Sequence, residues 1–243
     1  MEILGIDIGG SGLKGAPVDL DRGELLCDRV RLETPRPAKP KAVAEVFVQV
    51  AKAFDWEGPI GVGFPGIIRQ NFAQSAANLH SSWIGRDLED LFGSATGCSV
   101  GVVNDADAAG LAEIQYGAGR DRSGAVLLLT LGTGIGSALF IDGRLYPNSE
   151  FGHLNFKKTI AEKYTSAAAR KACKLSWAEW GERLNEYLVH IKRIISPDLV
   201  IIGGGASAKF EKFGSRINCG VEVLPAQLMN HAGIIGAALA GRV

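Results

Sequence analysis

Two segments of the chain each run from an apolar stretch through a glycine-rich turn into a second apolar stretch. Residues 3–15 read ILGIDIGGSGLKG, and residues 129–139 read LTLGTGIGSAL. Each pattern predicts two strands joined by a tight turn. Because the two turns lie about half of the 243-residue chain apart, we expect two lobes, each starting with such a hairpin.

The remaining pattern predicts an α/β protein, since short β-rich runs alternate with amphipathic helical stretches. The expected strands are 2–8, 12–18, 24–33, 60–66 and 100–104, and the expected helices are 41–54, 106–116 and 176–195. The last helix opens with a capping box, Ser176 with Glu179. Its Trp177 and Trp180 recur at helical spacing with leucines and isoleucines, so we assign them to the core rather than to a sugar-stacking surface.

Composition excludes several classes of protein. With 26 basic and 26 acidic side chains, the chain is unlike proteins that coat nucleic acid or a membrane surface. Its four cysteines form no C-x-x-C pair, which indicates a reducing, cytoplasmic setting and no zinc finger. The uncharged run 123–141 contains four glycines, and we interpret it as strand, turn and strand, not as a membrane span.

The first turn has the composition of a phosphate-binding site. Glycine has no Cβ to block close approach, so backbone N–H groups can converge on anionic oxygens, and Lys14 adds a positive charge. Asp7 would repel a phosphate unless a divalent cation lies between them, which makes it an indirect Mg²⁺ ligand. The turn residues concerned are Gly9, Gly10, Ser11 and Gly12. An ordinary tight hairpin is the alternative that this motif alone leaves open.

Further polar and glycine-rich positions favour phosphate and sugar chemistry. The second turn repeats the pattern with hydroxyls, and a third glycine cluster follows the apolar run 199–202. Asp105, at the end of a buried strand, is either a general base or a helix cap. Glu150 and His153 lie three residues apart, a polar pair suited to sugar hydroxyls; a metal site there is disfavoured because no third ligand lies nearby.

With these residues assembled, the sequence resembles the sugar-kinase branch of the ROK family (repressors, open reading frames and kinases), and within it the polyphosphate glucokinases. The similarity covers essentially the whole chain. It rests on the segments 7–14 (DIGGSGLK), 61–66 (GVGFPG), 77–85 (ANLHSSWIG), 104–113 (NDADAAGLAE), 129–139, 148–153 (NSEFGH) and 198–205 (DLVIIGGG).

The resemblance implies an actin-like (ribonuclease H-like) two-lobed kinase fold with a central cleft. The lobes would be 1–107 and 108–229, with the C-terminal helix 230–243 as a candidate addition to the first. Asp105 would be the catalytic base. The sugar would be bound by Gly66, Asn78, Asn104, Glu150 and His153. The donor would be bound by the first turn with Asp7 and Lys14, and by Thr130, Gly132, Thr133, Gly134 and Gly204.

Two departures from the family pattern affect these expectations. Many ROK kinases carry a cysteine-rich zinc loop after the E-x-G-H motif. That loop is missing here, so we expect no zinc site. By the resemblance, Glu162 would take the place of the glutamate that ends the loop and would bind the sugar. His80 stands where relatives of this branch tend to have an acidic residue, which leaves fine sugar and donor preference open.

Residues 29–41 (RVRLETPRPAKPK) form a basic strip with five basic residues and one acidic residue. A solvated loop without a function is the alternative that this composition leaves open. We hypothesise that part of this strip guides polyphosphate.

The expected activity is transfer of a phosphoryl group from polyphosphate or ATP to the 6-hydroxyl of glucose, with Mg²⁺. A kinase that uses only ATP on another hexose, such as mannose or glucosamine, is the alternative. A sugar-responsive regulator would need a DNA-reading module, and we expect none because the first turn starts within ten residues of Met1. A sugar-binding module without catalytic activity is the third hypothesis. Such a module would lack part of the polar set, whereas Asp7, Asp105, Glu150 and His153 are all present. From the family we expect a cytoplasmic homodimer that binds neither nucleic acid nor membrane.

Overall fold

The structure is a computed structural model that describes residues 1–76 and 79–242. The chain divides into two compact units. Unit 1 contains Met1–Ala112 and the segment from His231 onward, and unit 2 contains Glu113–Asn230. In the described part of the chain, no helix has the length and hydrophobicity that crossing a bilayer requires.

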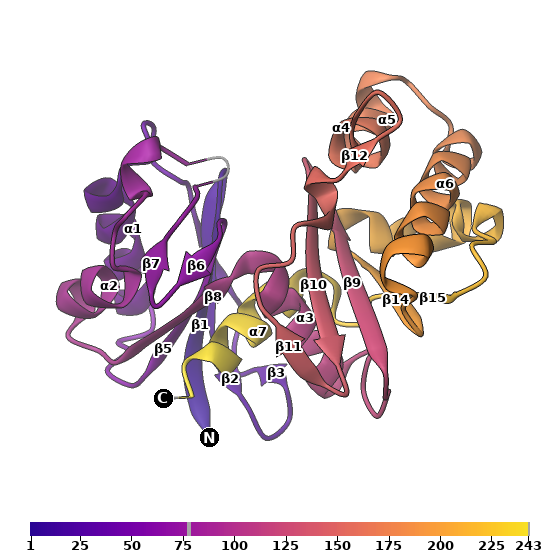
Figure 1. The fold of residues 1–243 in the computed structure, drawn as a ribbon. Coiled ribbons are helices and arrows are strands. Elements are labelled where there is room, and N and C mark those ends of the chain that lie inside the picture. The colour runs from indigo at the N-terminus through magenta and orange to yellow at the C-terminus, as the bar shows by residue number, and fades with distance from the viewer. Residues whose placement is uncertain (77–78, 243) are drawn as a thin grey trace. The chain divides into compact units, whose positions relative to one another are not determined.

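Unit 1 is built on a six-stranded sheet of order β3-β2-β1-β5-β8, with β4 also paired to β2 (Figure 1). These strands are β1 (Glu2–Gly9), β2 (Gly12–Asp19), β3 (Glu24–Leu25), β4 (Val30–Leu32), β5 (Ile60–Phe64) and β8 (Val100–Asn104). β6 (Ile68–Arg69) and β7 (Phe72–Ala73) form a separate ribbon. The helices are α1 (Pro40–Lys52), η1 (Ser81–Trp83), α2 (Leu88–Thr96), the first part of α3 (Asp105–Tyr116), and α7 (Ala232–Ala240).

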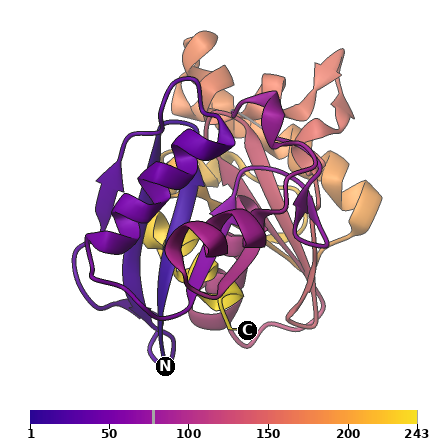
Figure 2. The same ribbon diagram turned by 90° about the vertical axis from the view of Figure 1, so that its left-hand side faces the viewer.

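One face of this sheet carries the main core of unit 1. Ile6 and Ile8 of β1 and Leu13 of β2 pack against α1 and α2, where the rings of Phe47 and Phe92 lie 4.3 Å apart. Figure 2 shows α1 and α2 in front of the sheet and α7 behind it. The alternation of apolar side chains along β1 therefore sets which face receives α1 and α2.

The opposite face is a close contact between backbones. Gly5, Gly61 and Gly101 are neighbours in the register of β1, β5 and β8. A Cβ on any of them would overlap a backbone carbonyl oxygen of α7, at Ile234, Ala237 and Ala240 respectively. Because these glycines lack side chains, α7 lies directly on the sheet, although it is more than 200 residues away from β1 along the chain.

Unit 2 repeats the connectivity of unit 1 on a five-stranded sheet of order β11-β10-β9-β14-β15. In each sheet one strand of an antiparallel hairpin pairs with a parallel strand, and that strand pairs with a second parallel strand. In unit 1, β1 pairs with β5 and β5 with β8; in unit 2, β9 pairs with β14 and β14 with β15. The strands are β9 (Ala125–Leu131), β10 (Ile135–Ile141), β11 (Arg144–Tyr146), β14 (Leu199–Gly203) and β15 (Glu222–Pro225), with a ribbon of β12 (Asn155–Phe156) and β13 (Thr159–Ile160). Both predicted glycine-turn hairpins are confirmed.

The helices of unit 2 are short, apart from the one that the sequence marks most clearly. They are α4 (Ala161–Thr165), α5 (Ala167–Ala172), α6 (Trp177–Ile195), η2 (Phe151–His153), η3 (Gly204–Lys212), η4 (Gly214–Arg216) and η5 (Met229–His231). The capping box of Ser176 and Glu179 starts α6, as predicted. Trp180 is buried and its indole donates to the carbonyl of Thr165, which confirms its place in the core.

Glu113 joins the beginning of unit 2 to its end. The side chain is fully buried, and its carboxylate accepts hydrogen bonds from the backbone N–H groups of Ala118, Gln227 and Leu228. A buried carboxylate is stable only when its oxygens are satisfied in this way. Glu113 therefore fixes the segment that leads out of β15 against the segment that leads out of α3.

The third strand of unit 1 differs from the prediction, because the expected strand 24–33 is interrupted. Its two pieces, β3 and β4, pair with opposite ends of β2 in registers that do not match. Pro17 lies between these two ends of β2 and has no N–H group to donate to a neighbouring strand. A continuous third strand is therefore not formed.

The contact between α7 and the sheet predicts a large effect of one methyl group. We expect Gly61→Ala to lower the free energy of unfolding by about 3 kcal/mol, because its Cβ would displace the backbone of α7. Gly205→Ala is the control: that position has open space around its Cβ, and the change should be below about 0.5 kcal/mol. Urea denaturation of both variants measures the difference, and equal stabilities would contradict this account of the packing.

Candidate active site

In unit 1, three charged side chains lie side by side across neighbouring strands. Asp7 of β1 is opposite Lys14 of β2, and Lys14 is opposite Arg31 of β4. Directly opposed residues project from the same face of a sheet, so the three side chains form one row. Lys14 Nζ lies 3.2 Å from Asp7 Oδ2, and both side chains are partly exposed. The row thus carries one paired acid and two cations.

The first glycine turn closes β1 and β2 and is held from outside the hairpin. Gly9 is opposite Gly12, which leaves Gly10 and Ser11 as a two-residue turn. The buried hydroxyl of Thr34 donates to the carbonyl of Gly9. A guanidinium N–H of Arg31 donates to the carbonyl of Ser11 at 3.0 Å. Both supporting residues lie in the basic strip 29–41, and no other feature of the sequence marked them for this role.

Asp7 also lies at the beginning of α7. A Cβ placed on Gly233, the second residue of that helix, would lie 3.2 Å from the carboxyl carbon of Asp7. The N-terminus of a helix carries partial positive charge and favours a nearby carboxylate. The glycine therefore lets the Asp7 carboxylate approach the helix end closely.

Asn104 ends β8, and its side chain caps α3. Its Oδ1 accepts hydrogen bonds from the N–H groups of Ala106 and Asp107, at 2.8 and 3.0 Å. Its Nδ2 donates to the carbonyl of Gly66 at 3.1 Å, and the side chain is buried. Gly66 itself has no room for a side chain, because a Cβ would overlap the carbonyl oxygen of Ser75. The cap that the sequence suggested for this motif is formed by Asn104.

Asp105 follows directly and lies near the row of charges. Gly63 of β5 is opposite Asp7 in the register, and a Cβ on Gly63 would lie 3.7 Å from Cα of Asp105. The two aspartates therefore flank a position that has no side chain. Since β1, β5 and β8 are parallel, their carboxyl ends meet at one edge of the sheet, where open α/β sheets bind ligands. Unit 1 gathers Asp7, Asp105, Lys14 and the glycine turn at this edge.

In unit 2 the second turn and the third glycine cluster are neighbours. Gly132 donates its N–H to the carbonyl of Gly134 at 3.1 Å and accepts a hydrogen bond from Ala168 at 3.1 Å. Gly203 pairs with Thr130 in the register of β14 and β9. Gly204 has a φ of +72° and packs so closely on Leu131 that a Cβ would lie 2.9 Å from its backbone. Thr133 lies between Gly132 and Gly134 in this turn.

The predicted sugar-binding residues of unit 2 also lie together. His153 Nδ1 is 3.4 Å from Glu150 Oε2, and a Cβ on Gly134 would lie 2.5 Å from Glu162 Oε2. Burial raises the pKa of Glu150 above its usual value; His153 opposes this rise, and the charge of Glu162 adds to it. His153 and Glu162 therefore both act on Glu150, and Glu162 lies against the second turn.

Residues that the sequence did not single out hold the Glu150–His153 segment in place. The hydroxyl of Ser137 donates to the carbonyl of Ser149 and accepts from the N–H of Phe151. The Tyr187 hydroxyl donates to the carbonyl of Phe151, and burial raises the pKa of this phenol. A Cβ on Gly152 would overlap the carbonyl oxygen of Ile135. The segment is thus fixed from β10 and α6.

Two further positions were singled out in the sequence, Asn78 and His80. Asn78 lies outside the described residues. His80 caps η1, since its Nδ1 accepts a hydrogen bond from the N–H of Ser82 at 3.1 Å. Among residues 1–76 and 79–242, no three His, Cys, Asp or Glu side chains lie close enough together to form a metal site.

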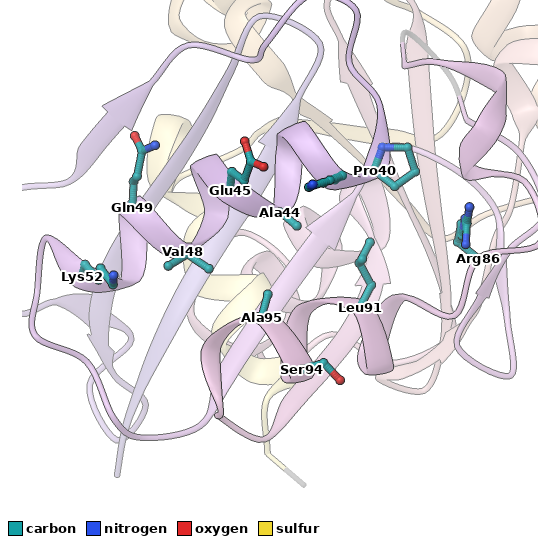
Figure 3. A pocket seen from close by; sticks show the side chains of 11 residues that line it. Pro40, Ala44, Glu45, Val48, Gln49, Lys52, Arg86, Leu91, Ser94 and Ala95 are labelled. Carbon is teal, nitrogen blue, oxygen red and sulfur yellow. The ribbon is translucent and has the colours of Figure 1, made fainter.

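The surface of unit 1 also has a groove of about 730 Å³ between α1 and α2 (Figure 3). Its floor is apolar and its rim is charged. It is lined by Pro40, Lys41, Ala44, Glu45, Val48, Gln49, Lys52, Arg86, Leu91, Ser94 and Ala95. None of the predicted site residues is among these described lining residues, so the groove is distinct from the edge that holds Asp7 and Asp105.

Comparison with known proteins identifies the family of this chain. The sequence profile of the ROK family matches residues 3–173. The chain belongs to the ROK family. Among its ROK relatives, the polyphosphate glucokinase of Mycobacterium tuberculosis is 46% identical over 238 residues, which cover 98% of this chain and 90% of that protein.

Solved ROK structures share the fold. The inorganic polyphosphate/ATP-glucomannokinase from Arthrobacter sp. strain KM superposes with a TM-score of 0.94 at 45% identity, covering 99% of this chain and 98% of that one. The ROK family glucokinase from Streptomyces griseus, in complex with glucose and AMPPNP, has a TM-score of 0.82 at 23% identity over 98% of both chains. The predicted α/β, actin-like fold of the ROK sugar kinases is confirmed.

The neighbours of Glu150 predict opposite effects on its pKa. Glu162→Gln removes a nearby negative charge and should lower the pKa of Glu150, whereas His153→Gln removes the side chain that opposes the rise and should raise the pKa of Glu150. Carboxyl ¹³C NMR titration of the protein measures both. The exposed Glu211→Gln is the control and should leave the titration unchanged. A rise of the pKa in the Glu162 variant would contradict the arrangement described here.

Proposed function

We propose that this protein is a glucokinase that transfers the terminal phosphoryl group of polyphosphate or ATP to the 6-hydroxyl of glucose. One observation carries the proposal: Asp105 and the Asp7–glycine turn meet at the same edge of the unit 1 sheet, on either side of Gly63. A general base beside a phosphate-binding turn is what phosphoryl transfer to an alcohol requires. The polyphosphate glucokinase similarity supplies the sugar and the donor.

Asp105 would accept the proton of the 6-hydroxyl as that oxygen attacks the terminal phosphorus. Lys14 and the N–H groups of the turn at Gly10 would neutralise and orient the donor, and positioning of this kind contributes most of the rate enhancement in such transfers. Glu150 and His153 would hold hydroxyls of the sugar ring, with the carboxylate accepting hydrogen bonds. Glu162 would contribute to the same pocket, and so would Asn104 through its contact with Gly66.

The residues at the turn fit a bound Mg²⁺. Mg²⁺ keeps several waters and needs only one or two protein carboxylates when donor phosphates supply other oxygens. Asp7 is a single, partly exposed carboxylate next to the turn, which suits this indirect mode. When bound, Mg²⁺ neutralises charge on the donor phosphates. Asp7 would orient that ion, and Lys14 would hold the carboxylate in place.

Mannose is a second candidate acceptor, because the Arthrobacter relative is named a glucomannokinase. The two sugars differ in one hydroxyl, so a pocket built on Glu150 and His153 can accommodate either. We further propose a cytoplasmic homodimer, as the ROK resemblance implies. The neutral net charge supports a protein whose partners are small anionic donors rather than nucleic acid.

A coupled assay of glucose 6-phosphate tests the activity and the donor together. We expect product from glucose with long-chain polyphosphate and with ATP, and little product from either donor when Mg²⁺ is chelated, because the donor charge is then uncompensated. Mannose in place of glucose tests the second acceptor. Saturable glucose binding without product from any donor would reject the kinase and support a sugar-binding module.

Asp105→Asn tests the base. The amide oxygen can still accept the hydrogen bond that Asp105 Oδ1 receives from Ala106, so the fold should be retained. We expect kcat to fall ~10²–10⁴-fold, with glucose affinity changed little, because base catalysis is typically worth this factor. Asp28→Asn, an exposed aspartate of unit 1, is the control. Near-normal turnover by Asp105→Asn would remove Asp105 from this role.

A further inference from the structure

The basic strip, residues 29–41, is anchored along its length. β4 pairs with β2, and the Thr34 hydroxyl donates to the first turn. Further along, the carbonyl of Ala38 accepts a hydrogen bond from the buried Trp83 indole at 2.8 Å. A solvated loop would not be tied down at these points. The backbone of the strip is therefore held at three places, and residues 30–32 form an outer strand of the unit 1 sheet.

Arg31 is a charged residue of the strip whose side chain reaches the first turn. Its guanidinium lies over Gly12, where a Cβ would be 3.1 Å from both Cζ and Nε, so the missing side chain at Gly12 makes room for it. One of its five N–H groups donates to the Ser11 carbonyl, and the side chain is otherwise exposed. Within residues 1–76 and 79–242, Arg31 forms no ion pair with an acidic side chain, whereas Lys14 is paired with Asp7.

The row of Asp7, Lys14 and Arg31 therefore has an acidic end and a basic end. Asp7, with Asp105 beyond Gly63, lies at one end, and Arg31 lies at the other end of the row, two strands away from β1. Adjacent strands are ~4.8 Å apart, so Arg31 lies about 10 Å across the sheet from Asp7. A donor whose terminal phosphoryl group is at the Asp7 end would present groups further along its chain to Arg31. In polyphosphate those groups are anionic phosphates, whereas in ATP a nucleoside follows the third phosphate.

We propose that Arg31, together with Lys14, forms a two-cation subsite at the Gly10–Ser11 turn that binds inner phosphates of a polyphosphate donor. The proposal rests on the proposed kinase function and deepens it, because it assigns donor preference to a residue of the strip. Arginine suits this task, since its planar fork can bind phosphate oxygens in pairs while one N–H stays on Ser11.

The test compares donors in steady-state kinetics of the full-length protein. Arg31→Gln should raise KM for long-chain polyphosphate about tenfold, the loss typical of one charge-assisted contact, and KM for ATP by less than about threefold. Arg31→Lys keeps the charge without the fork and should give an intermediate KM. Arg22→Gln is the matched control: this exposed arginine pairs with Glu24 near the other end of β2 and should leave both values unchanged.

Equal increases of KM for both donors would mean that Arg31 only braces the turn, and would overturn the proposal. An unchanged KM for polyphosphate would do the same. If Arg31→Gln does not fold, the Arg31→Lys variant decides the question by the ratio of its two KM values. If the wild-type protein phosphorylates no sugar, the proposed function fails on its own. Calorimetric binding of long-chain polyphosphate then still tests the subsite, and equal affinities of wild type and Arg31→Gln would reject it.

Discussion

The backbone of α7 lies directly on β1, β5 and β8, and the positions of the proposed catalytic groups depend on this contact. Three glycines in register, Gly5, Gly61 and Gly101, allow it. The helix start then falls beside Asp7, at Gly233. Further along, Gly236 packs so tightly on α3 that a Cβ would overlap the carbonyl oxygen of Ala108. Because α3 begins at Asp105, one helix sets the surroundings of both aspartates.

The glycine turns of both units are held by residues outside their own hairpins. In unit 1, Thr34 donates to the carbonyl of Gly9, just before the turn, and Arg31 donates to the carbonyl of Ser11 within it. In unit 2, Ala168 donates to Gly132, and Glu162 lies against Gly134. A turn rich in glycine has a large conformational entropy to lose, so such external contacts favour one conformation over the many that glycine permits. The repeated motif is therefore a hairpin together with its supports.

Local sequence signals predicted the parts of the fold that local physics determines. The two hairpins, the capping box of α6 and the start of α3 after Asn104 follow from turn residues, caps and periodicity, and the structure has them. The place of Arg31 next to Lys14 could not be predicted in this way, since it depends on the register between β2 and β4. The packing of α7 could not be predicted from local signals either, because it depends on glycines at distant positions in the sequence that leave room for its backbone. The double role of Asn104, as helix cap and as clamp on Gly66, was visible only in part, because a cap is a local pattern and the clamp is not.

The dependence of unit 1 on α7 has a consequence for biosynthesis. As the polypeptide leaves the ribosome, β1, β5 and β8 are available long before residues 232–240. Until that helix is synthesised, the sheet face that carries Gly5, Gly61 and Gly101 lacks the backbone that packs on it in the complete unit. Unit 2, in contrast, is contiguous in sequence and can complete its packing earlier. The contact between α7 and these three strands can therefore form only after residues 232–240 have been synthesised, and the proposed catalytic groups reach their final surroundings at that stage.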